Sequence, residues 1–300
     1  MSNSISIDKK HIYKYLSESP NPKGIIHISH GMAEHIKRYK WIINKLNIDG
    51  YHVISIDHRG HGKRVGMNPK GFFNDQNGWS LVVDDLLQLI KQSKQEFPNL
   101  KQFLLAHSMG SWIALSALQK NLIIDGLVLS GSSKPLRVII WVQKILIKIQ
   151  ILLSGKRSVS NFLDRITLGS YNKFFKPNRT KKDWISSDND NVDNYVSDPL
   201  CGFPVTNGLW DDLANGILNV FKHQNYSLSN KSIPILVISG SNDPVGENGK
   251  GVMRLFNFLS DLFLNVSIEI VKGARHEVFS DLDKDIIYNS FLKFIKKSND

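Results

Sequence analysis

The stretch that decides the fold reads FLLAHSMGS and occupies residues 103–111. Residues 103–106 form a short apolar run typical of a buried strand, and the residues after Gly110 have helical spacing. Ser108 therefore lies in the turn between a strand and a helix, with small residues two positions away on either side. This pattern indicates a nucleophile elbow, in which a tight turn presents a serine hydroxyl beside helix amides that can stabilise an oxyanion.

The elbow departs from the usual G-x-S-x-G pattern, because Ala106 replaces the first glycine. We expect the turn to accommodate one additional methyl group. The relaxed pattern leaves a second interpretation open, in which Ser108 is an ordinary helix N-cap serine.

Two polar residues that follow later apolar runs are suited to act with Ser108. Asp243 comes soon after the run 235–239, and His276 soon after the run 266–271. The chain order Ser, Asp, His is the one that accompanies a nucleophile elbow. A serine hydroxyl needs a base to remove its proton, and that base needs a carboxylate to fix its tautomer. We therefore predict Ser108 as nucleophile, Asp243 as acid and His276 as base.

Each partner also has a simpler interpretation. Asp243 lies in the turn-forming sequence NDP of residues 242–244, so its alternative is an ordinary turn aspartate. His276 is one of ten histidines in the chain, and its alternative is a surface loop histidine. Asp281 and Asp283, just past His276, are rival candidates for the acid.

The oxyanion donors are predicted from two loops. The sequence HGMAEH, residues 30–35, follows an apolar run, and we expect the backbone amides of Met32 and Met109 to point into the site. The alternative for His30 and Gly31 is a simple turn. The sequence DHRGHG, residues 57–62, is interpreted as a structural loop beside the site and is assigned no catalytic role.

Short apolar runs alternate with helical patterns along the chain, which predicts an α/β fold with a mostly parallel central sheet and helices on both faces. Ser4–Ile7 and His11–Leu16 are predicted as an antiparallel hairpin at one edge of this sheet. The predicted buried strands are Gly24–Ser29, His52–Asp57, Phe103–Ala106, Leu127–Ser130, Ile235–Ser239 and Val266–Val271, and the predicted helices include Trp79–Glu96, Ser111–Leu118 and Asp285–Ile295.

The alternation stops after Gly131, and no convincing strand follows for about seventy residues. We predict a core formed by residues 1–132 and 207–300, with an inserted helical cap at residues 133–206 over the carboxyl edge of the sheet. The segment Arg137–Leu153 has a wide apolar surface and a narrow basic stripe. It is either a cap helix buried against the core, where it lines a pocket, or one that also lies in a membrane interface.

Composition separates this chain from several classes of protein. The formal net charge is +11, but twelve of the 38 lysines and arginines lie between Ser133 and Lys182, where Asp164 is the single acid. The remaining bases and acids balance, so we predict no nucleic-acid partner.

Cys201 has no second cysteine to pair with, and the N-terminus lacks the apolar run of a secretory signal. We expect a cytoplasmic location, with peripheral membrane contact through the basic segment as an extension of it, and the oligomeric state stays open.

No segment of the sequence matches a metal-binding or cofactor-binding motif in full. The aspartates at 188, 190 and 193 resemble a calcium loop, but Val192 occupies the next ligand position and no glycine follows. Residues 246–251 lack the spacing of a phosphate loop, and no zinc-ligand spacing occurs. We therefore predict a reaction without metal or cofactor.

The motifs at residues 30–35, 57–62, 107–110, 241–243 and 273–276 resemble those of the monoacylglycerol lipase and lysophospholipase family of α/β-hydrolases. This resemblance implies an α/β-hydrolase fold and a carboxylesterase with a helical cap that acts on single-chain lipid esters such as monoacylglycerols or lysophospholipids. Two alternatives remain. One is a peptidase of the same fold, which would need an acidic group in the cap for a substrate amine. The other is a catalytically silent protein that binds a ligand in the same pocket.

Overall fold

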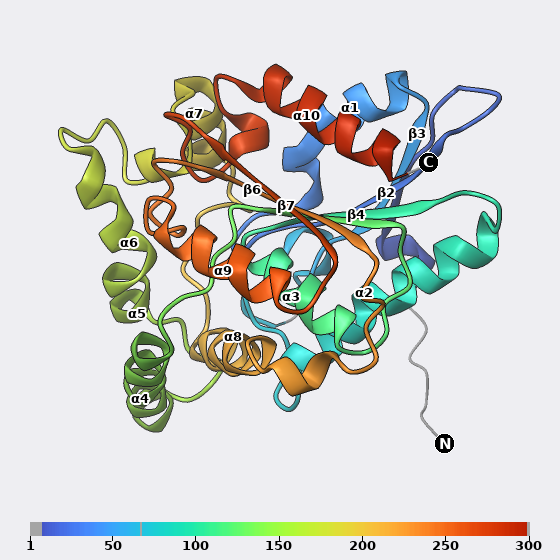
Figure 1. Cartoon of the computed structure of the whole chain (residues 1–300). Coiled ribbons are helices and arrows are strands. Elements are labelled where there is room, and N and C mark those ends of the chain that lie inside the picture. The colour runs from blue at the N-terminus through green and yellow to red at the C-terminus, as the bar shows by residue number, and fades with distance from the viewer. Residues whose placement is uncertain (1–7, 67, 299–300) are drawn as a thin grey trace.

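The computed structural model describes residues 8–66 and 68–298, and its centre is a seven-stranded sheet (Figure 1). The strand order is β1-β3-β2-β4-β5-β6-β7. β1 runs antiparallel to β3, and the other neighbouring strands pair in parallel. The strands are β1 (Ile12–Tyr15), β2 (Gly24–Ser29), β3 (Tyr51–Ile56), β4 (Gln102–His107), β5 (Gly126–Ser130), β6 (Pro234–Gly240) and β7 (Asn265–Val271).

The central strands β2 and β4 are buried along their whole length because both faces of the sheet are covered. In β4, Phe103 and Leu105 face one hydrophobic cluster, whereas Leu104 and Ala106 face another. This two-residue alternation places every side chain of β4 in a buried position. The predicted α/β fold with a mostly parallel sheet is therefore confirmed.

The two faces are covered by different helices. Helices α1 (Lys40–Ile48) and α10 (Lys284–Lys297) pack on the face of Phe103. The opposite face carries helices of the other cluster, seen below the sheet in Figure 1. These are α2 (Gly78–Glu96), α3 (Met109–Leu118), α8 (Asn207–Val220) and α9 (Lys250–Ser260).

The predicted hairpin is described only for its second arm. β1 lies at the sheet edge and pairs with β3, Ile12 opposite Ile56. Ser4–Ile7, the expected first arm, lies outside the described residues.

The chain between β5 and α8 is helical and lies beside the sheet in Figure 1. Within its described residues, the one pairing of β type is an isolated bridge between Val159 and Thr206. The helices are α4 (Arg137–Ser154), α5 (Asn161–Ile166), α6 (Leu168–Tyr171) and α7 (Asn189–Ser197). The division into a core and a cap at residues 133 and 206 stays a prediction.

Helix α4 is more exposed than a buried cap helix would be. Only Ile140 and Ile147 are buried in it. Burial against the core, one of the two interpretations of this segment, therefore applies to one narrow stripe of the helix only. In residues 8–66 and 68–298, no helix has the length and apolarity needed to cross a bilayer. The large apolar side chains that α4 exposes are Val138, Ile139, Trp141, Val142, Ile145, Ile149, Leu152 and Leu153.

Candidate active site

Ser108 occupies the sharp turn between β4 and α3. Its φ of 51° and ψ of −121° are unusual for a residue with a side chain, and its hydroxyl makes no hydrogen bond that caps the helix. The interpretation of Ser108 as an ordinary N-cap serine therefore has no support in the geometry. A Cβ on Gly110 would lie 2.1 Å from the Ser29 carbonyl oxygen, whereas the Ala106 methyl group is buried in the hydrophobic cluster. The turn thus requires glycine after the serine and accepts alanine before it.

His276 and Asp243 form a buried pair on the loops that follow β7 and β6. The His276 Nδ1 atom lies 3.0 Å from each carboxylate oxygen of Asp243. Burial of the imidazole lowers its pKa, but the nearby Asp243 charge outweighs this effect, and the pKa of His276 is raised above its ordinary value. Asp243 also accepts a hydrogen bond from the Val245 N–H at 2.9 Å. The carboxylate is therefore placed to hold the ring with its proton on Nδ1.

The rings of His107 and Trp184 enclose His276. Their centroids lie 4.7 and 5.1 Å from that of His276. His107 immediately precedes Ser108, so the elbow and the His276–Asp243 pair meet at the same edge of the sheet. Trp184 was not predicted as a site residue, because nothing in its local sequence pattern links it to a loop about ninety residues later.

The rival acids do not contact His276. The Asp281 carboxylate accepts hydrogen bonds from the backbone N–H groups of Arg275, Ser187 and Leu282. Asp283 lies at the start of α10. The geometry thus separates a carboxylate that orients the imidazole from one that fixes its loop.

The predicted oxyanion donors belong to two segments that meet at Ser108. Met32 and Met109 line one cavity with Ser108. A Cβ on Gly31 would lie 3.2 Å from Ser108 Cβ, so the loop passes directly over the elbow. Within the described part of the chain, no acceptor receives a hydrogen bond from the Met32 or Met109 N–H. Both amides are therefore available to a ligand oxygen, and Met109 also lies at the positive end of α3.

The loop at residues 30–36 is held by buried polar side chains. The Gly31 N–H donates to the Glu34 carboxylate, which also accepts from the Tyr39 hydroxyl at 2.8 Å. Burial and then the charge of Glu277 raise the pKa of Glu34 to about 7. Glu34 belongs to the motif at residues 30–35, but its contacts with Gly31 and Tyr39 were not predicted from the sequence.

The cavity beside Ser108 measures about 290 Å³. Its described lining contains no lysine, arginine or histidine, and its single acid is Glu247. The Glu247 carboxylate is already paired with the Arg254 guanidinium. Ile139 and Ile140 of α4 contribute to the apolar wall, together with Trp112, Trp210, Leu213 and Ile217. The cavity can therefore hold an apolar chain next to the serine.

One cluster has the side chains that a metal site would need. His35, Asp198 and Cys201 bring one ligand atom each within 4.8 Å of one another. However, the His35 ring already bonds Asp198 at 2.8 Å, and burial raises the pKa of the Cys201 thiol. A protonated thiol is a poor ligand, so we assign no metal to these residues.

The chain is similar to known hydrolases in both sequence and fold. A family profile described as "Serine aminopeptidase, S33" (Hydrolase_4) matches residues 20–283. The chain is 26% identical over 300 residues to the monoglyceride lipase of Rattus norvegicus, which covers 96% of this chain and 86% of that protein. It is 26% identical over 276 residues to the probable lysophospholipase L2 of Haemophilus influenzae, at 88% and 80% coverage. A thermostable carboxyl esterase from Bacillus coagulans superposes with a TM-score of 0.87 and 28% identity, covering 96% and 94% of the two chains.

Proposed function

The chain belongs to the serine aminopeptidase S33 (Hydrolase_4) family and is a serine hydrolase, and we propose that it hydrolyses neutral single-chain lipid esters through Ser108, His276 and Asp243. The membership confirms the resemblance that the sequence motifs indicate. The observation that carries the proposal is the hydrogen-bonded pair of His276 and Asp243, whose Nδ1 and carboxylate oxygen lie 3.0 Å apart beside the elbow. The Ser108 hydroxyl in that elbow makes no hydrogen bond that caps helix α3.

The proposed reaction has two acyl-transfer steps. Ser108 Oγ attacks the ester carbonyl carbon while the His276 Nε2 atom takes the hydroxyl proton. The N–H groups of Met32 and Met109 donate hydrogen bonds to the oxyanion that forms. The alcohol then leaves with the proton from His276, and Ser108 remains acylated. Water gives a proton to His276 and attacks the acyl group, which releases the fatty acid and restores the Ser108 hydroxyl.

The cavity lining supports a neutral substrate over a charged one. A phosphate buried there would have no cationic partner, because the described lining carries no basic side chain. An apolar acyl chain is suited to the same walls. We therefore favour monoacylglycerols over lysophospholipids as the substrate class. The proposed reaction steps use only the side chains of Ser108, His276 and Asp243, the backbone amides of Met32 and Met109, and water.

The peptidase alternative would require a free carboxylate for a substrate amine. Glu247 is the single acid in the described lining, and its pairing with Arg254 leaves it engaged. This arrangement disfavours an aminopeptidase activity, although the family model is described as a serine aminopeptidase.

A side-by-side assay tests the proposal. The purified chain is assayed with monoacylglycerols, p-nitrophenyl esters, lysophosphatidylcholine and aminoacyl p-nitroanilides, and its serine is labelled with a fluorophosphonate. We expect labelling at Ser108 and fastest turnover of a monoacylglycerol. Fastest turnover of the anilides would establish a peptidase instead. No labelling and no hydrolysis would establish a silent ligand-binding protein.

A further inference from the structure

His30 lies buried with each ring nitrogen facing a backbone group. The His58 N–H donates to the His30 Nε2 atom at 2.9 Å, and the Nδ1 atom lies 2.8 Å from the Gly31 carbonyl oxygen. A nitrogen that accepts a hydrogen bond carries no proton, and a carbonyl oxygen can only accept. The ring is therefore neutral, with its proton on Nδ1 donated to Gly31. Burial, opposed by the Asp57 charge, lowers the pKa of His30 to about 4, in keeping with a neutral ring.

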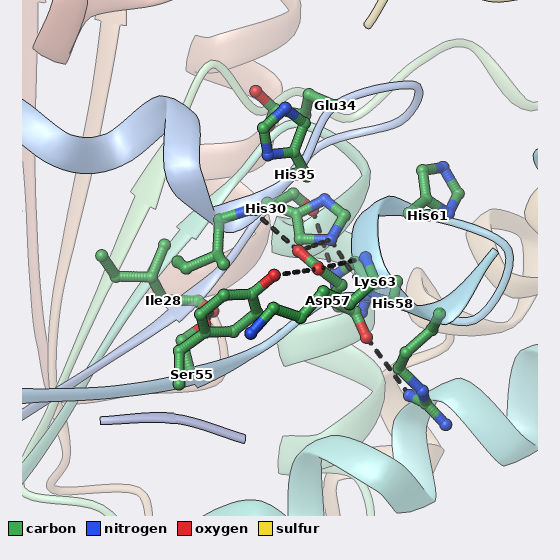
Figure 2. Close-up of polar contacts among 12 residues, drawn as sticks. Ile28, His30, Glu34, His35, Ser55, Asp57, His58, His61 and Lys63 are labelled. Atoms are coloured by element: carbon green, nitrogen blue, oxygen red, sulfur yellow. Dashed lines mark hydrogen bonds and ion pairs between the residues drawn. The ribbon is translucent and has the colours of Figure 1, made fainter. Parts of the chain in front are cut away.

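The loop after β3 holds this arrangement from outside the catalytic loops. The ring of His58 donates back from Nε2 to the His30 carbonyl oxygen at 3.1 Å, so the two residues are joined twice. The Asp57 carboxylate accepts from the Ile36 N–H at 2.9 Å. Figure 2 shows Asp57 and His58 beside His30, at the base of the loop that carries Glu34 and His35. Both ends of the loop at residues 30–36 are thus attached to residues 57 and 58.

The contact with Gly31 determines where the next amide points. The Gly31 carbonyl and the Met32 N–H belong to one planar peptide unit, and in a trans peptide they point in opposite directions. Fixing the carbonyl toward the His30 ring therefore fixes the N–H on the other side. That N–H has no acceptor in the described part of the chain, and Met32 lines the cavity with Ser108.

We propose that His30 is a positioning residue that directs the Met32 N–H toward the oxyanion. The His58 N–H occupies the His30 Nε2 atom, so the ring proton is on Nδ1. This proton holds the Gly31 carbonyl, and the attached Met32 N–H therefore points the other way. This inference rests on the proposed function, because the Met32 amide is the proposed oxyanion donor. Without the His30 contact, rotation of the Gly31–Met32 peptide would turn a carbonyl dipole toward the developing negative charge. The loss would fall on the transition state and leave substrate binding nearly unchanged.

Two isosteric substitutions test this role. The amide of asparagine lies where His30 has Nδ1, and the amide of glutamine lies where it has Nε2. We expect His30→Asn to retain the contact to Gly31 and most of kcat. His30→Gln should lose at least about tenfold in kcat with little change in KM, approaching the ~10²–10³ of a deleted oxyanion donor.

The matched controls are His27→Asn and His27→Gln. His27 is also fully buried in β2, and its ring nitrogens contact the Ile54 carbonyl at 2.9 Å and Gln102 at 2.7 Å. These variants lower stability by disturbing a buried ring but leave the oxyanion loop alone, so kcat per folded molecule should stay near the wild-type value. Equal losses of kcat in the Asn and Gln variants of both histidines would reduce His30 to a structural role and overturn the proposal.

A measurement on the unaltered protein keeps the test independent of folding. Imidazole nitrogen NMR should show the His30 proton on Nδ1 and a bare Nε2 at neutral pH, and the opposite tautomer would overturn the proposal. Wild-type hydrolysis that Ser108→Ala abolishes establishes the proposed function separately. If that hydrolysis is present while His30→Gln keeps full kcat, the positioning role alone fails.

Discussion

The imidazole of His276 shares its Nδ1 contact almost equally between the two carboxylate oxygens of Asp243, which is wholly buried. A buried carboxylate with its charge directed at one ring stabilises the imidazolium that forms during catalysis, and it sets the tautomer beforehand. Substitutions of this pair should therefore lower the rate of the chemical step, and their effect on kcat can be compared with their effect on stability.

Replacing Asp243 with asparagine should leave Ser108 in place and disable the base. The amide can donate to Nδ1 and favour the wrong tautomer, which costs about 10⁴ in kcat in a serine protease with this triad. Steady-state kinetics with a p-nitrophenyl ester measure the effect. Asp281→Asn is the matched control, because Asp281 holds backbone amides and does not contact His276. It should lower the melting temperature and spare turnover, and the reverse pattern would assign the acid to Asp281.

Ser108→Ala should abolish ester hydrolysis while the chain remains folded. The residual rate expected from binding and the oxyanion amides is only about 10³–10⁴ over water. Ser116→Ala, which removes a buried hydroxyl from the helix that follows Ser108, serves as the control. Ser116 accepts from the Trp79 indole and lies away from the elbow, so its loss should leave kcat unchanged. Circular dichroism of both variants confirms folding, and substantial turnover by folded Ser108→Ala would remove the nucleophile assignment.

The pH profile should carry the signature of the His276–Asp243 pair. The base must be neutral to take the serine proton, and the pKa of His276 is raised above its ordinary value of 6.5. Log kcat/KM should therefore rise with pH and level off only above pH 6.5. In Asp243→Asn the largest of the charges that raise the pKa of His276 is gone while burial still lowers this pKa, so the rise should move to lower pH. A wild-type profile that is flat through this range would contradict the assignment of His276 as base.

Helix α4 should bring the enzyme to anionic membranes. Trp141, Ile145 and Leu152 are 47%, 61% and 86% exposed, in a segment rich in lysine and arginine. Each base near an anionic surface contributes about 1 kcal/mol, and the attraction fades as the Debye length falls from ~10 Å at 0.1 M salt to ~3 Å at 1 M. Ser108→Ala protein should co-sediment with anionic vesicles at low salt, and less at high salt.

The double variant Ile145→Glu/Leu152→Glu should lose this vesicle binding. Ile123→Glu is its control, since Ile123 is 73% exposed but lies before β5. Equal binding to neutral and anionic vesicles that does not change with salt would contradict this prediction, and the positive charge would then contribute to solubility only.

The bounds of the parallel strands could be predicted from sequence to within two residues, because the strands inside the sheet are largely apolar runs. β7 also lies where expected, but it is an edge strand without a buried residue, so its predicted burial is wrong. β2 begins and ends where expected, at Gly24 and Ser29. Helix α8 was not anticipated, although Thr206 caps it by accepting from the Leu209 N–H. Its interior contains Gly208 and Gly216, which lower helix propensity and obscure the pattern.

The site was predictable where chemistry coincides with a strand end, as it does for Ser108, Asp243 and His276. Their catalytic roles stay predictions, but the structure brings them to one edge of the sheet. The contacts of His30 with His58 were not predictable, because they depend on how two loops meet in space. The exposure of α4 stayed open at the level of sequence for a related reason: an apolar pattern indicates a surface that is suited to burial but does not say what covers it.

The helical chain between β5 and β6 divides the proposed catalytic groups between two halves of the sequence. Ser108 and Met32 precede it, while Asp243 and His276 follow it. A cut in this segment would leave the nucleophile on one fragment and the acid–base pair on the other. The two fragments would meet along the parallel pairing of β5 with β6, Leu127 opposite Ile235. Hydrolysis would then report reassembly, so the fold has the layout of a split reporter enzyme.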